Sequence, residues 1–220
     1  MSTLKKAIVM SFPGYEELYN IAKPSVELFA RKHGYDIRTF TDNPYDREPS
    51  WTKIKRLIET FEAGYDVAFW LDADTVIVNP AQDISIPEEM HQGFVEHRVD
   101  GTTAINAGVW YLKKEALPFL QEVWETGIVP ASVYDWWEQN TVLQTLGIST
   151  MHPYVKPQQP NAYLQKTFFL DYGWNVGVFD ARNFGTHRLR ILHAAGCGSV
   201  VRRADIMRRW VTQLCVDKLT

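Results

Sequence analysis

The chain alternates short runs of apolar residues with longer segments in which apolar residues recur every three or four positions. The runs predict buried strands, and the recurring positions predict helices with one buried face. The predicted strands cover residues 7–10, 37–40, 67–71, 107–112 and 191–192. The predicted helices cover residues 15–33, 51–63, about 114–124, about 136–146 and the last twenty residues, and residues 153–173 are predicted to be rich in loops.

Individual residues refine the ends of the first two helices. Gly34 and Gly64 predict where these helices end, and Ser50 is predicted to cap the start of the second. Pro24 is predicted to kink the first helix or to divide it in two. The second helix is expected to bury one face, formed by Trp51, Ile54, Leu57, Ile58 and Phe61.

No repeat, low-complexity tract or Gly/Ser linker divides the 220 residues. The order strand, helix, strand, helix, strand predicts one α/β domain with a mostly parallel central sheet flanked by helices. The strand at 67–71 is apolar at each position, as in a central strand that is covered on both faces. Ligands of open α/β sheets bind beyond the carboxyl ends of such strands, so the residues that follow position 71 are well placed for chemistry.

Composition narrows the class of protein. With 45% hydrophobic residues, 22% charged residues and a net charge of -3, the chain is unlike disordered, collagen-like or coiled-coil proteins, and no nucleic-acid partner is expected. The eight Trp, ten Tyr and eleven Phe either fill a core or line a pocket for a ring-shaped ligand. No apolar run reaches the roughly 18 residues of a membrane span, and no signal-peptide core is found. Two cysteines and no glycosylation sequon predict a cytoplasmic location.

Asp72 and Asp74 directly follow the predicted central strand. In an extended backbone, residues two apart point to the same side, so the two carboxylates are expected to converge on one cation. Mg²⁺ and Mn²⁺ prefer such oxygen ligands and commonly bind through carboxylates together with substrate phosphates. The alternative interpretation is a pair of aspartates that cap a helix or a turn.

A second enzyme class also fits this segment. The run Asp72-Ala73-Asp74-Thr75-Val76 resembles the nucleophile motif of haloacid-dehalogenase-type phosphatases. Those enzymes usually carry the motif on their first strand and a paired-acid motif late in the chain. Here two predicted strands precede it, and Asp171 and Asp180 form no obvious acid pair. A phosphatase is therefore the minor alternative.

Five short motifs occur in a recognisable order between residues 51 and 197. They are Trp51-x-Lys53, Tyr65-Asp66-x4-Leu71-Asp72-Ala73-Asp74, Asn106-Ala107-Gly108-Val109, Glu138-Gln139-Asn140 and His193-x-x-Gly196-Cys197. Together they resemble glycosyltransferase family 34, which has the GT-A fold and is related in layout to family 8. The resemblance implies one GT-A catalytic domain over residues 1–220, with a nucleotide and metal part at about 1–112 and an acceptor-side part at about 113–220.

The resemblance implies that Asp72 and Asp74 are the metal-binding pair and that His193 is the third protein ligand. An imidazole beside two carboxylates shifts the preference among divalent ions from Mg²⁺ towards softer transition ions. Mn²⁺ is therefore the expected cofactor, with Mg²⁺ as the alternative. Taken alone, His193 would be interpreted as a core histidine.

The resemblance also implies a site for the nucleotide and its diphosphate. Its residues would be Lys53, Asp72, Ala73, Gly196 and Arg202. The family often carries a lysine just after its His-x-x-Gly motif, and this sequence has none there, so Arg202 or Arg203 is the expected substitute.

Arginines are concentrated near the end of the chain, where residues 182–209 contain seven of them and the single acid Asp205. This basic block suits a diphosphate, a phosphorylated acceptor or peripheral contact with an anionic membrane, and a solvated helix surface is the alternative.

The same resemblance implies which residues contact the donor sugar. They are Asn106, Ala107, Gly108, Asp135 and Gln139. Gln139 and Glu138 are implied as the catalytic residues, with Gln139 facing the anomeric carbon. The residues alone also allow a turn that contains Asn106 and a helix that is capped by Asp135.

Aromatic residues are the candidates for contact with the acceptor. Trp136, Trp137 and Trp174 are expected to stack on sugar rings, with core packing as the alternative for at least two of them. The loop-rich segment 153–173 is expected to close over the donor.

The activity expected from the resemblance is metal-dependent transfer of a sugar from a nucleoside-diphosphate sugar to a hydroxyl of a glycan or glycoconjugate, with retention of the anomeric configuration. A UDP-linked donor is expected, with a GDP-linked donor as the alternative. Besides the phosphatase, a non-catalytic sugar-nucleotide-binding module is the second alternative function.

Overall fold

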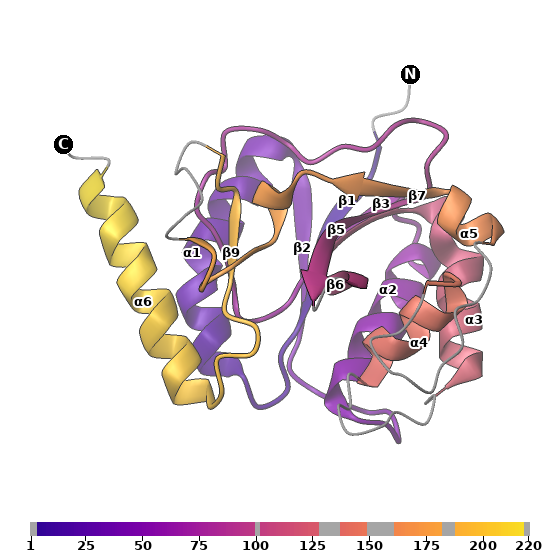
Figure 1. The fold of residues 1–220 in the computed structure, drawn as a ribbon, viewed down its shortest axis with the longest axis horizontal. Helices are drawn as coiled ribbons and strands as arrows, with labels where there is room; N and C mark the ends of the chain where they lie inside the picture. Colours follow the sequence, from indigo (N-terminus) through magenta and orange to yellow (C-terminus); the bar gives the residue numbers. More distant parts are fainter. Residues whose placement is uncertain (1–3, 100–101, 128–136, 149–160, 182–187, 218–220) are drawn as a thin grey trace.

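A six-stranded mixed sheet forms the centre of the protein in the computed structural model, which describes residues 4–99, 102–127, 137–148, 161–181 and 188–217 (Figure 1). The strand order is β2-β1-β3-β6-β5-β7. The strands are β1 (Lys6–Ser11), β2 (Tyr35–Phe40), β3 (Val67–Leu71), β5 (Gln92–Val99), β6 (Thr102–Lys113) and β7 (Thr167–Leu170).

Three of the five strand pairings in this sheet are parallel. Strand β1 runs parallel to β2 and β3, and β5 runs parallel to β7. Strand β6 is antiparallel to both of its neighbours, β3 and β5. The predicted α/β fold with a mostly parallel sheet is confirmed. The chain goes from β1 to β2 on one side and to β3 on the other, so a crevice is expected beyond the carboxyl ends of β1 and β3.

Helices cover both faces of the sheet, because alternate side chains of each central strand point to opposite faces and both sets are apolar. On β1, Ile8 and Met10 belong to one buried cluster, and Ala7 and Val9 belong to the other. Helices α1 (Glu16–His33) and α6 (Val200–Asp217) pack on the first face, where Figure 1 shows them side by side. Helices α2 (Thr52–Glu62), α3 (Leu117–Thr126) and α4 (Trp137–Thr145) pack on the second.

Helix α1 continues through Pro24, so the predicted division in two is wrong. The hydroxyl of Ser25 donates to the Ala22 carbonyl and accepts a hydrogen bond from the Ile77 backbone N–H, which ties this part of the helix to a neighbouring strand. The helix ends at Gly34, as predicted; this residue has the left-handed conformation, φ 71°, that glycine adopts without steric cost.

The predicted start of the second helix needs a correction. Ser50 lies in a 3₁₀ turn, η1 (Pro49–Trp51), and its buried hydroxyl makes no hydrogen bond with any described residue, so it is not the cap. Helix α2 begins at Thr52, whose hydroxyl donates to the Pro49 carbonyl. The predicted face is confirmed; its five residues Trp51, Ile54, Leu57, Ile58 and Phe61 are all buried.

Some elements differ from those predicted. Strand β6 begins at Thr102, and strands β5 and β7 were not predicted. Helix α5 (Ala162–Gln165) and β7 lie where loop was expected, while residues 153–160 lie outside the described part. Residues 114–124 form a 3₁₀ turn, η2 (Lys114–Ala116), followed by α3, and another 3₁₀ turn, η3 (Tyr172–Trp174), follows β7.

A second, three-stranded sheet lies beside the first and has the order β4-β9-β8. It consists of β4 (Thr75–Ile77), β9 (Ile191–His193) and β8 (Val176–Gly177). Strand β4 is antiparallel to β9, with Thr75 opposite His193. This register places His193 directly beside the segment that carries Asp72 and Asp74.

Among the helices of the described residues, none combines the length and the apolar character that crossing a membrane requires.

Candidate active site

A turn, rather than an extended backbone, connects the two aspartates, which corrects the predicted local geometry. Strand β3 ends at Leu71, and the backbone N–H of Thr75 then donates to the Asp72 carbonyl oxygen over 3.1 Å. The Thr75 hydroxyl donates to the same oxygen over 2.7 Å. The backbone N–H of Ala194, next to His193, donates to the Asp74 carbonyl over 2.9 Å. These hydrogen bonds hold the turn against the end of β9.

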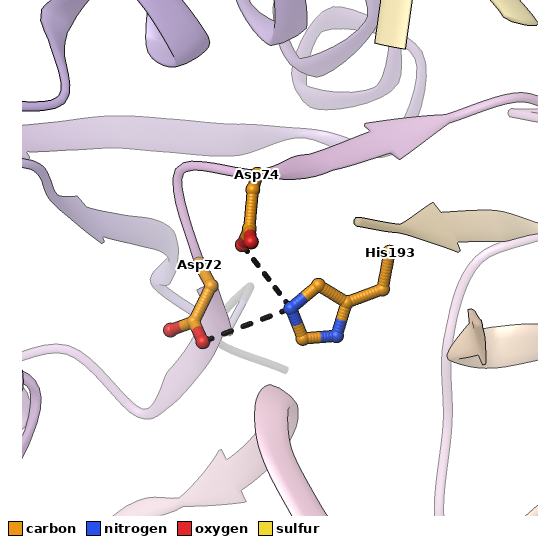
Figure 2. A group of neighbouring side chains, drawn as sticks. All are labelled: Asp72, Asp74 and His193. Carbon is orange, nitrogen blue, oxygen red and sulfur yellow. Dashed lines mark hydrogen bonds and ion pairs between the residues drawn. The ribbon is translucent and has the colours of Figure 1, made fainter. Parts of the chain in front are cut away.

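The turn brings both carboxylates to one edge of the His193 ring (Figure 2). The His193 Nε2 atom lies 3.1 Å from Asp74 Oδ1 and 3.9 Å from Asp72 Oδ2. One ligand atom from each of the three residues lies within 4.8 Å of the other two. Two carboxylates and an imidazole are a donor set that suits Mn²⁺, and Asp74 and His193 are buried while Asp72 is half-buried. The three residues therefore fit a divalent cation.

The ionisation of the buried pair Asp74 and His193 depends on the charged groups around them. Burial alone would raise the pKa of Asp74, but His193 and Arg203 hold that pKa below its ordinary value. Burial alone would lower the pKa of His193, but Asp74 and then Asp72 raise it above its ordinary value. The site therefore keeps Asp74 as a carboxylate, the form that binds metal ions.

Two cationic side chains approach the aspartates from opposite elements. Arg203, in the first turn of α6, places Nη1 3.1 Å from Asp74 Oδ2. Lys53, in the first turn of α2, places Nζ 3.2 Å from Asp72 Oδ1 and 2.8 Å from Glu138 Oε1. Lys53 is only 4% exposed and Glu138 only 5%. Burial opposes the charge of Lys53, but Asp72 and Glu138 together raise its pKa, so the lysine remains protonated.

Strand β6 forms the floor beneath this cluster. The backbone N–H of Gly108 donates to Asn106 Oδ1 over 2.8 Å, and that of Ala107 donates to Gln139 Oε1 over 3.1 Å. The Gly108 carbonyl accepts the Asp72 backbone N–H over 2.8 Å. Residues 106–108 therefore lie in the body of a strand, not in a turn at its beginning.

A cavity of about 660 Å³ opens over the cluster. Of the residues singled out from the sequence, its walls include Lys53, Asp72, Ala73, Asp74, Asn106, Trp137, Glu138, Gln139, His193 and Gly196. Trp137 is 49% exposed and has a positive φ of 41°, a strained conformation for a residue with a side chain. The cavity extends past the end of β1, at Ser11 and Tyr15, as the strand order predicts.

Some site residues expected from the sequence lie elsewhere. Arg202 is exposed and does not line the cavity, whereas its neighbour Arg203 does, because adjacent residues of a helix point about 100° apart. Trp174 is buried in the core and is not part of the cavity wall. Ala107 and Gly108 are buried beneath the cavity.

Several predictions fall on residues outside the described part of the chain: Asp135, Trp136 and Arg182. In the arginine-rich region, Arg188 pairs with Asp171, Arg190 donates to Gln82, and Arg208 pairs with Glu17 of α1. These contacts account for part of the basic block through interactions within the protein.

His97 and Asn175 were not singled out from the sequence, although both lie at the site. His97 lines the cavity, and its buried Nε2 atom has no hydrogen-bond partner in the part of the chain that the structure describes. Burial and then the nearby His193 lower the pKa of His97 to about 4, so this ring is neutral at pH 7. Asn175 is fully buried and contacts both His193 and Asn106. A lone asparagine among the apolar residues of 174–178 was the signal available in the sequence.

Several solved structures with a similar fold are glycosyltransferases. A glycosyltransferase involved in glycosylation of the major capsid of PBCV-1 shares 20% identity over 93% of this chain and 99% of its own, with a TM-score of 0.69. GlyE of Streptococcus pneumoniae TIGR4 shares 11% identity over 96% of this chain and 64% of its own, with a TM-score of 0.57. The galactosyltransferase LgtC, in complex with donor and acceptor sugar analogs, shares 12% identity over 93% and 95%, with a TM-score of 0.50.

No protein-family model matches the sequence, and no curated protein matches it. The narrower assignment to glycosyltransferase family 34 therefore stays a prediction. At these low identities the structural likeness shows the fold: the chain has the mixed α/β architecture of GT-A glycosyltransferases, a six-stranded central sheet flanked by helices.

Proposed function

We propose that this protein is a metal-dependent glycosyltransferase that moves a sugar from a nucleoside-diphosphate sugar, UDP-linked, to a hydroxyl of a carbohydrate acceptor. The observation that carries the proposal is the convergence of Asp72, Asp74 and His193 in the wall of a cavity of about 660 Å³, in a chain with the GT-A fold. Asp72, Asp74 and His193 would hold the ion, Mn²⁺ or alternatively Mg²⁺. When bound, such an ion acts as a Lewis acid that stabilises the negative charge of the departing diphosphate.

The nucleotide is assigned to the end of the cavity beyond β1 and β3. The buried hydroxyls of Ser11 and Ser50 have no hydrogen-bond partners among the described residues, and both residues line the cavity, as does Tyr15. Unpaired buried hydroxyls are expected to bind a ligand or water, and an aromatic ring supports a nucleobase. Arg203 and the loop at Gly196 lie beside the metal cluster, where their positive charge and backbone can contact the diphosphate.

The transferred sugar is assigned to the part of the cavity lined by Gln139 and Trp137. The Gln139 oxygen accepts the Ala107 N–H, which fixes the side-chain amide and leaves its NH₂ group able to donate to a sugar hydroxyl. The exposed face of Trp137 is the candidate surface for an acceptor ring. In this proposal residues of about 1–112 supply most of the nucleotide and metal part, His193, Gly196 and Arg203 complete that part from later in the chain, and the acceptor side lies in the remainder from about 113.

Retention of configuration is supported by the state of Glu138. Its carboxylate is 2.8 Å from the Lys53 ammonium and is buried, so its charge is already balanced, which makes it a poor nucleophile and also a poor general base of the kind that an inverting reaction requires. We therefore assign Glu138 to holding Lys53 and Asp72 in place. Attack of the acceptor hydroxyl on the face from which the diphosphate departs would form the new C–O bond, break the bond to the phosphate oxygen and transfer the hydroxyl proton to that phosphate.

The phosphatase alternative is weakened by the structure. Asp171 pairs with Arg188, the Tyr172 hydroxyl donates to Asp180, and neither aspartate lines the cavity. A late acid pair close to Asp72 is therefore not found among the described residues.

The test of the proposed function is a panel of UDP- and GDP-sugars with Mn²⁺, assayed for nucleotide release with the wild-type protein and with Asp74→Ala. We expect one donor to be turned over, EDTA to abolish the activity, and Asp74→Ala to lower kcat/KM by about 100-fold or more, because the departing diphosphate loses charge stabilisation. Asp205→Ala, at an exposed carboxylate on α6, is the matched control and should behave as wild type. Nucleotide binding without turnover would favour the binding module, and metal-dependent cleavage of p-nitrophenyl phosphate would favour the phosphatase.

The two adjacent arginines of α6 provide a sharper test of the diphosphate assignment. Arg203→Met should raise KM for the sugar nucleotide roughly 10-fold, in line with the loss of one or two charge-assisted hydrogen bonds. Arg202→Met removes the same charge from the exposed side of the helix and should change KM less than twofold. Steady-state kinetics at fixed ionic strength measure both, and equal effects would contradict the assignment of Arg203.

A further inference from the structure

We propose that Asn175 is a positioning residue that holds His193 with a proton on Nδ1, so that Nε2 is the ring nitrogen left to bind a metal ion beside Asp72 and Asp74. This inference rests on the proposed function, because it concerns how the protein prepares its metal ligand. It adds a residue that lies behind His193 and does not itself reach the cavity.

Asn175 links two parts of the site from a fully buried position between η3 and β8. Its Oδ1 atom lies 2.9 Å from His193 Nδ1. Its Nδ2 atom lies 3.1 Å from Asn106 Oδ1 and 3.3 Å from the Asn106 backbone oxygen. The side chain thus connects β9, which carries His193, to β6 beneath the metal cluster.

The neighbouring hydrogen bonds determine which atom of the Asn175 side-chain amide is the oxygen and which is the nitrogen. The backbone N–H of Gly108 can only donate, so the atom of Asn106 that it contacts, at 2.8 Å, must be oxygen. The backbone carbonyl of Asn106 can only accept. The group of Asn175 that faces both of these acceptors must therefore be its NH₂, and its oxygen must face His193.

An oxygen acceptor at Nδ1 requires a proton on that nitrogen. The other nitrogen, Nε2, is then the one whose lone pair binds a metal ion in the neutral ring, and it lies 3.1 Å from Asp74 and 3.9 Å from Asp72. Without a metal ion, a proton on Nε2 makes the hydrogen bond to the Asp74 carboxylate. Gly108 presses against the ring, since an added Cβ would lie 2.1 Å from His193 Cε1, so the ring has little room to turn. Metal-binding histidines generally depend on such a partner at the second nitrogen.

Mn²⁺ binding, measured with MnCl₂ alone by the electron paramagnetic resonance signal of the free ion, tests this role without any need for turnover. Asn175→Leu, which has a similar size and no acceptor, should weaken Mn²⁺ binding about 10- to 100-fold. Asn175→Asp keeps an oxygen opposite Nδ1 and should recover most of that loss. Gln92→Met is the matched control, because it removes a buried amide that donates to Thr167 on β7, away from the cavity, and it should bind Mn²⁺ as wild type does.

A second measurement, of the proton on His193 Nδ1, does not depend on metal binding. In wild-type protein with ¹⁵N-labelled histidine, NMR should show a proton on Nδ1 of His193 both without metal and with Mg²⁺, with His193→Asn used to assign the signal. An unprotonated Nδ1 would overturn the proposal, as would wild-type Mn²⁺ affinity in a folded Asn175→Leu variant. If the wild-type protein bound no Mn²⁺, the proposed function would fail, whereas the NMR result would still decide the state of His193. If Asn175→Leu does not fold, the same NMR result decides.

Discussion

Replacing Gly108 with alanine is expected to weaken metal binding strongly while leaving a folded protein. The added methyl carbon would lie 2.1 Å from His193 Cε1 and 2.9 Å from Asp72 Oδ2, far inside van der Waals contact. The His193 ring is buried and held from behind by Asn175, so it cannot move aside without leaving the two aspartates. We expect Mn²⁺ affinity and kcat/KM to fall about 100-fold or more, and the free energy of unfolding to fall by about 1–3 kcal/mol from overpacking.

Gly93→Ala on the neighbouring strand β5 is the control for the general effect of adding a methyl group to this sheet. There the new carbon would lie 2.8 Å from Cγ2 of Ile86, in the loop between β4 and β5, and Gly93 is not part of the cavity wall. Gly93→Ala should lower the free energy of unfolding measured by urea denaturation and leave the Mn²⁺ affinity measured by titration unchanged. Normal metal binding by Gly108→Ala would mean that His193 is not needed in its present position.

The sequence predicts elements well where one strand or helix carries its own signal. The strand at 67–71 has the predicted bounds, because a run apolar at each position lies between polar residues. Strand β7 was missed because it has only four residues, and β5 was missed because polar residues, Gln92, Glu96 and His97, interrupt its apolar ones. These strands are defined by pairing with β6 and with each other, which is not visible in local sequence.

The site residues also fall into those that the local sequence reveals and those that only the fold brings together. Asp72 and Asp74 are two positions apart in the sequence and are recognised from that spacing, and the resemblance pointed to His193. Lys53 and Glu138 are 85 positions apart, and only the packing of α2 against the start of α4 reveals that they form a buried ion pair. The sequence did not show whether Arg202 or Arg203 faces the site. That depends on how α6 is rotated about its axis, and in the structure Arg203 is the one that reaches Asp74.

Lys53→Met is expected to lower the free energy of unfolding by about 3 kcal/mol, because removing one partner of a buried ion pair leaves the other charge unpaired. Lys53 Nζ is the cation between Glu138, at 2.8 Å, and Asp72, at 3.2 Å. Without it, the two carboxylates share one region with no ammonium between them. A bound divalent cation would offset part of that negative charge, so Mn²⁺ should stabilise Lys53→Met by more than it stabilises the wild type. Urea denaturation with and without Mn²⁺ measures both effects.

A double variant separates the charge effect from simple loss of packing. Lys53→Met combined with Glu138→Leu removes both charges and should recover more than half of the lost stability, since a well-packed apolar pair can replace a buried ion pair. Lys6→Met is the control, because Lys6 pairs with Asp83 at 2.8 Å in a more exposed position, and its loss should cost about 1 kcal/mol or less. If Lys53→Met lowered the free energy of unfolding no more than Lys6→Met does, Lys53 would not be required to stabilise the charge of Glu138. Glu138 would then again be a candidate for direct attack on the sugar, in competition with same-face attack by the acceptor hydroxyl.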